Sequence, residues 1–182
     1  MSAATTTTPS KTQADGKPGM ISQYLIFSLG KELFAVGTLR VREIIEYGNL
    51  TAVPMMPSFI RGVINLRGAV VPVIDLNARF GRARTDISRR TCIVILEVQS
   101  DDDTHVLGIV VDAVSAVRQI DNASIEPPPS FGTRIRADFI DGMAKINNTF
   151  VILLDLGKVL SVDEISMLDG ISSHDESART AG

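Results

Sequence analysis

An internal repeat constrains the fold of this 182-residue chain more than any other feature of its sequence. Residues 62–76 align with residues 142–156 without a gap, at an offset of 142 − 62 = 80. Each segment opens on glycine, places a two-residue tip between two apolar stretches, and ends in Asp-Leu. Both tips suit a tight β-hairpin turn with positive φ. The repeat therefore predicts a chain built from two copies of one small β unit. The tips are Arg67-Gly68 and Asn147-Asn148.

A shorter similarity lies upstream, where residues 41–44 resemble residues 117–120 at an offset of 117 − 41 = 76. The four-residue difference falls in the loop that ends at Pro129, where an insertion costs little. Short runs rich in Val and Ile, punctuated by Gly and Pro, predict a mostly β fold. Each copy holds about five such runs, which favours barrels over an open sheet. We expect a first barrel over residues 22–88 and a second over residues 89–160.

The two ends of the chain are polar. Residues 1–20 are rich in threonine and residues 171–182 carry few apolar side chains, so we expect both segments to be disordered. Before the second tail, Ser-Val-Asp-Glu at residues 161–164 matches a capping box and predicts a short C-terminal helix over residues 162–168. The folded part of the chain is then expected over residues 21–170.

Composition argues against several classes of function. The formal net charge is −3, no dense Lys/Arg run occurs and Trp is absent, which disfavours nucleic-acid binding. No apolar run reaches the ~18 residues of a membrane span. The single cysteine, Cys92, lies in an apolar run and predicts a buried thiol in a cytosolic protein. His105 and His174 have no third ligand at metal-site spacing, and no cofactor-binding loop occurs, so we expect neither a metal nor a cofactor.

Asp75 and Asp155 are related by the repeat and suggest, as a remote alternative, a two-lobed aspartate-dependent hydrolase. That chemistry usually uses Asp-Thr-Gly or Asp-Ser-Gly loops, whereas both aspartates here precede leucine and a helical run. We therefore expect each aspartate to cap a short helix and expect no catalytic residue. The helix after Asp75 should stop at Gly81. Residues 81–90, which are polar and cationic, predict a linker or an exposed loop.

Positions at which the two copies differ are candidates for function, because the shared fold does not need them. An arginine at the tip of a hairpin contributes little to a core, and its planar fork suits docking onto carboxylates or carbonyl groups of a partner protein. The sequence therefore predicts a non-catalytic contact surface around Glu43 and Arg67. On these alignments the differing pairs are Arg67 and Asn147, Asn65 and Lys145, and Glu43 and Gln119.

The run Phe-Ile-Arg-Gly-Val-Ile-Asn-Leu-Arg-Gly at residues 59–68, continued by Val-Pro-Val-Ile-Asp-Leu at residues 71–76, resembles the CheW-like chemotaxis coupling proteins. The resemblance covers residues 22–170 and includes Val-Arg-Glu-Ile at residues 41–44 and Gly-Ile-Val-Val-Asp at residues 108–112. It implies two intertwined five-stranded barrels of the SH3-like type, in keeping with the repeat.

The same resemblance implies a cytoplasmic, non-catalytic adaptor that is recruited to membrane receptor arrays without inserting into the membrane. Its partners would be the cytoplasmic tip of methyl-accepting chemotaxis receptors and the regulatory domain of the CheA histidine kinase, whose contact residues are left unassigned. An alternative is a coupling module that acts with a separate response-regulator protein. The receptor-binding positions carried over by motif are Val41, Glu43, Ile44, Gly62, Asn65, Arg67, Gly68, Val114 and Val117.

Overall fold

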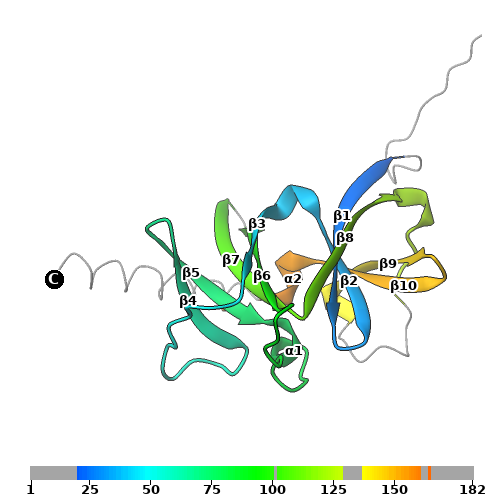
Figure 1. Cartoon of the computed structure of the whole chain (residues 1–182). Coiled ribbons are helices and arrows are strands. Elements are labelled where there is room, and N and C mark those ends of the chain that lie inside the picture. The colour runs from blue at the N-terminus through cyan, green and yellow to red at the C-terminus, as the bar shows by residue number, and fades with distance from the viewer. Residues whose placement is uncertain (1–19, 101, 129–136, 161–163, 165–182) are drawn as a thin grey trace, which may run out of the picture.

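The computed structural model describes residues 20–100, 102–128, 137–160 and 164. In these residues the chain forms ten β-strands in two five-stranded curled sheets, with two one-turn α-helices (Figure 1). The predicted mostly β fold is confirmed. No helix in the described residues is long and apolar enough to span a membrane. The expected tails and C-terminal helix lie outside these residues, apart from Met20 and Glu164.

The first sheet, here called barrel A, combines the two ends of the described chain. Its strands are β1 (Ile21–Leu29), β2 (Glu32–Gly37), β8 (Ala113–Asp121), β9 (Ile140–Ile146) and β10 (Thr149–Leu154). Their order is β8-β1-β2-β10-β9, in which β2 and β10 are parallel and the other neighbours antiparallel. A bridge between Glu126 and Met143 joins the segment after β8 to β9, so the sheet curls toward closure.

The second sheet, barrel B, has the same arrangement. Its strands are β3 (Val41–Glu46), β4 (Ile60–Leu66), β5 (Ala69–Asp75), β6 (Cys92–Ser100) and β7 (Asp103–Val111). Their order is β3-β6-β7-β5-β4, and the parallel pair is β5 with β7. A bridge between Thr51 and Val63 joins the segment after β3 to β4.

The strands are not divided between the barrels as the sequence predicted. Barrel B is one continuous stretch of chain, whereas barrel A takes β1 and β2 from the first copy and β8 to β10 from the second. The expected barrels over residues 22–88 and 89–160 are therefore wrong, because the chain changes barrel at the 3₁₀ turn Thr38–Arg40 and at Asp112. Those bounds mark the repeated units. A repeat in sequence does not reveal with which copy each strand pairs.

The repeat itself is present in the structure. The β4–β5 and β9–β10 hairpins occupy equivalent places beside the parallel strand pairs. Each is followed by a one-turn helix, α1 (Leu76–Arg79) or α2 (Leu156–Val159), and Asp75 and Asp155 cap these helices as predicted. Both tips turn with positive φ, as predicted. The φ values are 54° at Arg67, 88° at Gly68, 50° at Asn147 and 65° at Asn148.

The shorter upstream similarity does not follow the strand register. When the paired residues are followed strand by strand through each sheet, Glu43 on β3 occupies the position that Ala116 occupies on β8. The offset is 116 − 43 = 73, so the equivalent of Glu43 is not Gln119. Both strands are bulged at the preceding residue, Arg42 or Ser115, which supports this equivalence. In barrel B, following the residue paired across each neighbouring strand from β5 to β3 gives Val73, Gly108, Ile95 and Glu43. In barrel A, the same steps from β10 to β8 give Leu153, Ala35, Ile26 and Ala116.

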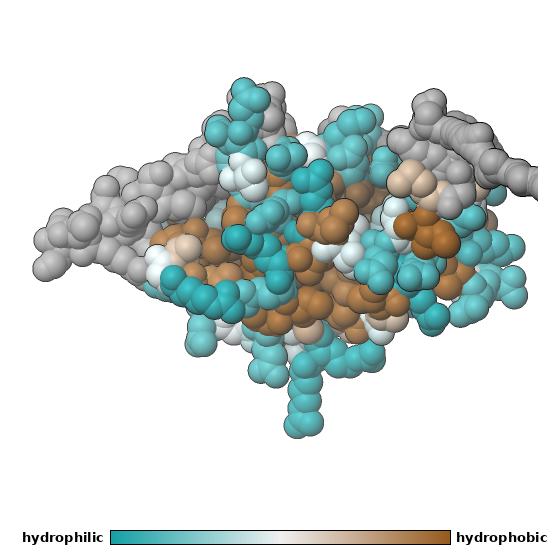
Figure 2. Space-filling view, turned by 90° about the horizontal axis from the view of Figure 1, so that it is seen from above, coloured by the Kyte–Doolittle hydropathy of each residue, from teal (hydrophilic) through white to brown (hydrophobic). Residues whose placement is uncertain are grey.

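Buried side chains form one large cluster and two small ones. One face of each curled sheet packs its own small cluster, and the other faces contribute to a large cluster shared by both barrels. Strand alternation explains the division, since Ile26 and Ile95 lie in the small clusters and their neighbours Phe27 and Leu96 in the shared one. Seen from above, apolar side chains are exposed over the middle of the molecule, with polar side chains around and among them (Figure 2). The large apolar side chains exposed in the described residues are Met20, Ile21, Leu39, Ile44, Met55, Ile87, Val117 and Phe150.

Candidate functional site

The tip of the β4–β5 hairpin is a tightly held two-residue turn. Arg67 and Gly68 both have positive φ, which matches the twist of the two strands that they join. The side-chain oxygen of Asn65 accepts a hydrogen bond from the backbone N–H of Gly68 at 2.9 Å. Asn65 therefore stabilises the turn that presents Arg67, and its predicted contact with a partner stays a prediction.

Arg67 reaches from this tip to Glu43 on β3 and forms a bidentate ion pair. The contacts are Nη1 to Oε2 at 2.5 Å and Nη2 to Oε1 at 3.1 Å, with the arginine side chain 75% exposed and the glutamate side chain 24% exposed. The hydrogen bond from Arg67 is the main cause that lowers the pKa of Glu43, against a smaller opposing effect of burial. The same hydrogen bond raises the pKa of Arg67. The sequence placed these two residues on one surface, and the structure joins them.

A groove of ≈ 510 Å³ opens beside the ion pair, between β3, the β4–β5 hairpin and β7. Its lining mixes apolar and charged side chains, as protein-binding surfaces commonly do. The β7 wall was not predicted, because only the pairing of β7 with β5 brings these residues here and no local motif marks them. The lining residues are Arg42, Glu43, Leu66, Arg67, Ala69, Val70, Val71, Thr104, His105 and Val106.

The nine predicted receptor-binding positions do not lie in one place. Four of them gather at the tip and the groove, namely Glu43, Asn65, Arg67 and Gly68. Ile44 on β3 and Val117 on β8 are 42% and 53% exposed, each on its own barrel. The strand register makes these two residues equivalent, since Ile44 pairs with Val94 and Val117 with Leu25.

The remaining three predicted positions contribute to the fold. Val41 and Val114, which are also equivalent in register, pack against the core that the barrels share. Gly62 is buried and has a φ of +149°, and a Cβ there would lie 2.3 Å from the carbonyl oxygen of Thr51. Glycine is thus needed at this position for the close approach that joins β4 to the segment after β3.

Barrel A has a smaller groove at the position equivalent to the one beside Arg67. Its volume is ≈ 180 Å³, and Ala116 and Asn147 replace Glu43 and Arg67. The equivalent groove therefore lacks the ion pair, although the backbone that frames it is repeated. Its lining residues are Ile26, Leu33, Ser115, Ala116, Arg118, Ile146, Asn147, Thr149 and Val151.

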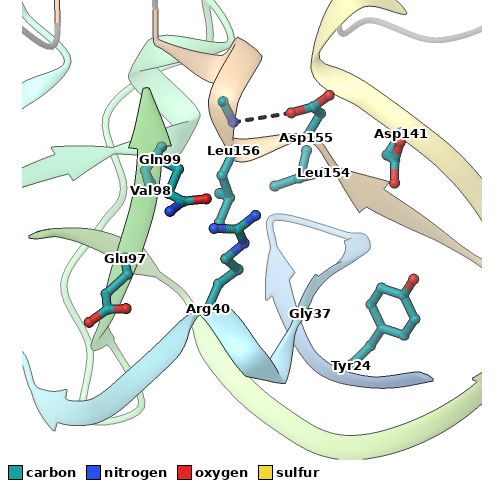
Figure 3. Close-up of a pocket in the computed structure, with 11 residues that line it drawn as sticks. Tyr24, Gly37, Arg40, Glu97, Val98, Gln99, Asp141, Leu154, Asp155 and Leu156 are labelled. Atoms are coloured by element: carbon teal, nitrogen blue, oxygen red, sulfur yellow. Dashed lines mark hydrogen bonds between the residues drawn. The ribbon is translucent and has the colours of Figure 1, made fainter. Parts of the chain in front are cut away.

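A third hollow, of ≈ 360 Å³, lies between the barrels (Figure 3). Arg40 reaches into it from the 3₁₀ turn, and Tyr24, Asp141 and Asp155 line it from barrel A. Asp141 stands at the repeat position of Arg61, so this copy has two carboxylates where the other has an arginine–aspartate pair. Burial raises the pKa of Tyr24, and the charge of Asp141 adds to this effect.

Asp75 and Asp155 have separate partners. Asp75 is fully buried and forms an ion pair with Arg61 at 3.0 Å. Asp155 accepts a hydrogen bond from the Gly157 N–H at 3.1 Å (Figure 3) and lies 3.9 Å from Lys158. Each carboxylate thus serves the helix that it caps. Within the residues that the structure describes, no three His, Cys, Asp or Glu side chains are grouped to hold a metal ion.

Comparisons with known proteins agree with this architecture. The family model for the CheW-like domain matches residues 23–164. The chemotaxis protein CheW of Klebsiella aerogenes is 34% identical over 150 residues, which cover 82% of this chain and 88% of that protein. The probable chemotaxis protein CheW of Rhizobium etli is 34% identical over 142 residues, which cover 78% and 89%.

A solved structure shows the same fold. The scaffolding protein TtCheW from Thermoanaerobacter tengcongensis superposes with a TM-score of 0.71 and 36% sequence identity, covering 85% of this chain and 96% of that one. The family match over residues 23–164 spans both barrels and includes the hairpin that carries Arg67. The chain therefore belongs to the CheW-like domain family.

Proposed function

We propose that this protein is a non-catalytic scaffold that couples the cytoplasmic tip of chemotaxis receptors to the regulatory domain of a CheA-type histidine kinase. Family membership supports the scaffold role, as do the names of its relatives, which are chemotaxis and scaffolding proteins. In this role the protein would be cytoplasmic and would reach the membrane through the receptors.

The observation that carries the receptor part of the proposal is the groove beside the Glu43–Arg67 ion pair. Its apolar side chains, among them Leu66 and Val106, offer a surface for the apolar stripe of a helix. The exposed fork of Arg67 is held in place by Glu43 and by the turn, so it can fix the register of that helix. We assign the receptor contact to this groove, with Ile44 and Val117 as further exposed apolar contacts.

The experiment that tests this proposal is reconstitution with Arg67→Ala. Purified receptor cytoplasmic fragment and histidine kinase are combined with the wild-type protein or the variant, and both co-sedimentation and kinase autophosphorylation are measured. Because Arg67 is 75% exposed, the variant should fold normally. We expect its receptor affinity to fall about ten-fold, as for a charged contact at the centre of an interface.

The control is Lys31→Ala, which removes an exposed cation from the β1–β2 turn of barrel A. It should leave both readouts within about two-fold of wild type, as expected of a surface substitution outside an interface. Unchanged receptor recovery and kinase activity with Arg67→Ala would refute the assignment of the groove. Failure of the wild-type protein to couple the two partners would refute the scaffold role.

A further inference from the structure

The cationic segment 81–90 connects α1 to β6 (Figure 1), and hydrogen bonds hold it against barrel B. Thr85 is only 4% exposed, and it donates its backbone N–H and its hydroxyl to the Asp75 carboxylate at 2.8 and 2.9 Å. Its carbonyl accepts a hydrogen bond from Arg61, and its hydroxyl accepts one from Asn77 at 2.8 Å. A buried polar network therefore holds the centre of the loop against barrel B.

A second anchor holds the far end of this loop. The Ser88 N–H donates to the Thr91 hydroxyl at 2.8 Å, the Thr91 N–H donates to the Ser88 carbonyl at 3.2 Å, and Thr91 is 2% exposed. Arg89 and Arg90 are the two residues between these partners, and both are exposed. The hydrogen bonds thus fix the backbone that presents two consecutive arginine side chains to solvent.

The charges of the loop are only partly neutralised within the protein. The loop contains four arginines and one aspartate. Arg82 pairs with Glu32, whereas Arg89 and Arg90 form no ion pair with any residue that the structure describes. Ile87 precedes Arg89 by two residues and is 46% exposed. The result is a cationic surface with an apolar side chain, on a backbone that is already ordered.

We propose that this surface, residues 84–90, docks an acidic segment of a partner protein. Arginine forks on an ordered backbone lose little freedom when they bind carboxylates, and Ile87 offers a place for an apolar side chain of the same segment. The net charge of −3 disfavours a nucleic acid as the ligand. The surface lies at the opposite end of β5 from Arg67, about 20 Å away for a strand of this length. It is therefore separate from the groove and does not depend on its function.

The test measures binding of two fluorescent decapeptides to the full chain at about 50 mM NaCl, where screening is weak. One probe is decaglutamate, and the other carries a central leucine among glutamates. We expect Arg89→Glu with Arg90→Glu to weaken both probes about ten-fold. The matched control, Lys31→Glu with Lys145→Glu, makes the same change in net charge at two exposed lysines of barrel A and should stay within about two-fold. Ile87→Asn should remove the advantage of the leucine-containing probe.

Three results would overturn the proposed docking of an acidic segment. If the loop variant and the control weaken peptide binding equally, the effect is due to overall charge and the proposal is wrong. Absence of binding by the wild-type chain, or tighter binding of single-stranded DNA or anionic vesicles than of the peptides, would also overturn it. Arg67→Ala should leave both peptide affinities unchanged, which separates this surface from the receptor groove. Circular dichroism of each variant shows that the comparison is made between folded proteins.

Discussion

At the scale of single residues, the two copies share a backbone and differ in what their tips carry. Both hairpins turn through two residues with positive φ, but one presents Arg67 and the other Asn147. Glu43 is the ion-pair partner of Arg67, and in barrel A the strand register places Ala116 at its position. Two substitutions therefore separate a groove with an ion pair from one without it, and neither affects the hydrogen bonds of the sheet.

The ion pair with Arg67 should affect the titration of the Glu43 carboxyl. Because the hydrogen bond from Arg67 lowers the pKa of Glu43, Arg67→Ala should move that pKa back toward 4.5. The sign follows from linkage: a carboxyl with a lowered pKa in the folded state stabilises the fold above 4.5, and this contribution is lost as the pH falls through the folded-state pKa. Side-chain carboxyl NMR of Glu43 measures the shift, and an identical titration in both proteins would contradict the ion pair in solution.

Two glycines of the β4–β5 hairpin should respond very differently to substitution by alanine. At Gly62 a new Cβ meets the Thr51 carbonyl at 2.3 Å, whereas at Gly68 nothing lies within 4 Å. We expect Gly62→Ala to cost ~3 kcal/mol or more through steric overlap and backbone strain, and Gly68→Ala ~1 kcal/mol through its positive φ alone. Urea unfolding of both variants gives the comparison. Similar costs would show that the barrel adjusts at Gly62.

At the scale of elements, the same Asp-Leu motif caps a helix in two different surroundings. Asp75 and Asp155 each cap a one-turn helix that follows a hairpin. Around Asp75, however, the loop that follows α1 folds back so that Thr85 and Arg61 bury the carboxylate completely. Asp155 has the acidic Asp141 at the position of Arg61 and remains partly exposed beside a hollow.

Replacing each aspartate by asparagine should separate capping from burial. Asparagine caps a helix about as well as aspartate, so Asp155→Asn should change stability by less than ~0.5 kcal/mol. Asp75→Asn keeps the cap but leaves Arg61 without its buried counter-charge, which should cost ~3–5 kcal/mol. Chemical denaturation measures both values. Equal effects would mean that the network around Asp75 contributes nothing beyond the cap.

Local signals in the sequence explain which elements were predictable. The hairpin tips, the Asp caps and the closeness of Glu43 to Arg67 follow from short motifs, so they were found. The bulges at Arg42 and Ser115 were missed because a bulge leaves no mark in composition, and the apparent match of residues 41–44 to 117–120 hid the true register. The β7 side of the groove depends on a parallel pairing between β5 and β7, which no local pattern encodes.

At the scale of the whole molecule, the barrels cannot be separated by cutting between the repeated units. Each unit gives two strands to one barrel and three to the other, and the largest apolar cluster takes side chains from both barrels. Burial of this shared core favours cooperative folding of the whole. Relative movement of the barrels is therefore opposed by an apolar interface, and partners bound to different barrels contact one connected body.

This topology predicts how the chain behaves when it is divided at residue 88. The fragments 1–88 and 89–182 each lack strands that complete a barrel, so neither should fold alone, and mixing them should restore the strand signal in circular dichroism. A protease site placed between Arg89 and Arg90, in an exposed turn, divides the folded protein one residue further along the chain. The nicked chain should run as one species in size-exclusion chromatography until denaturant is added. If the two fragments fold independently, each must contain a complete set of paired strands. The barrels would then follow the repeated units in sequence, which contradicts this topology.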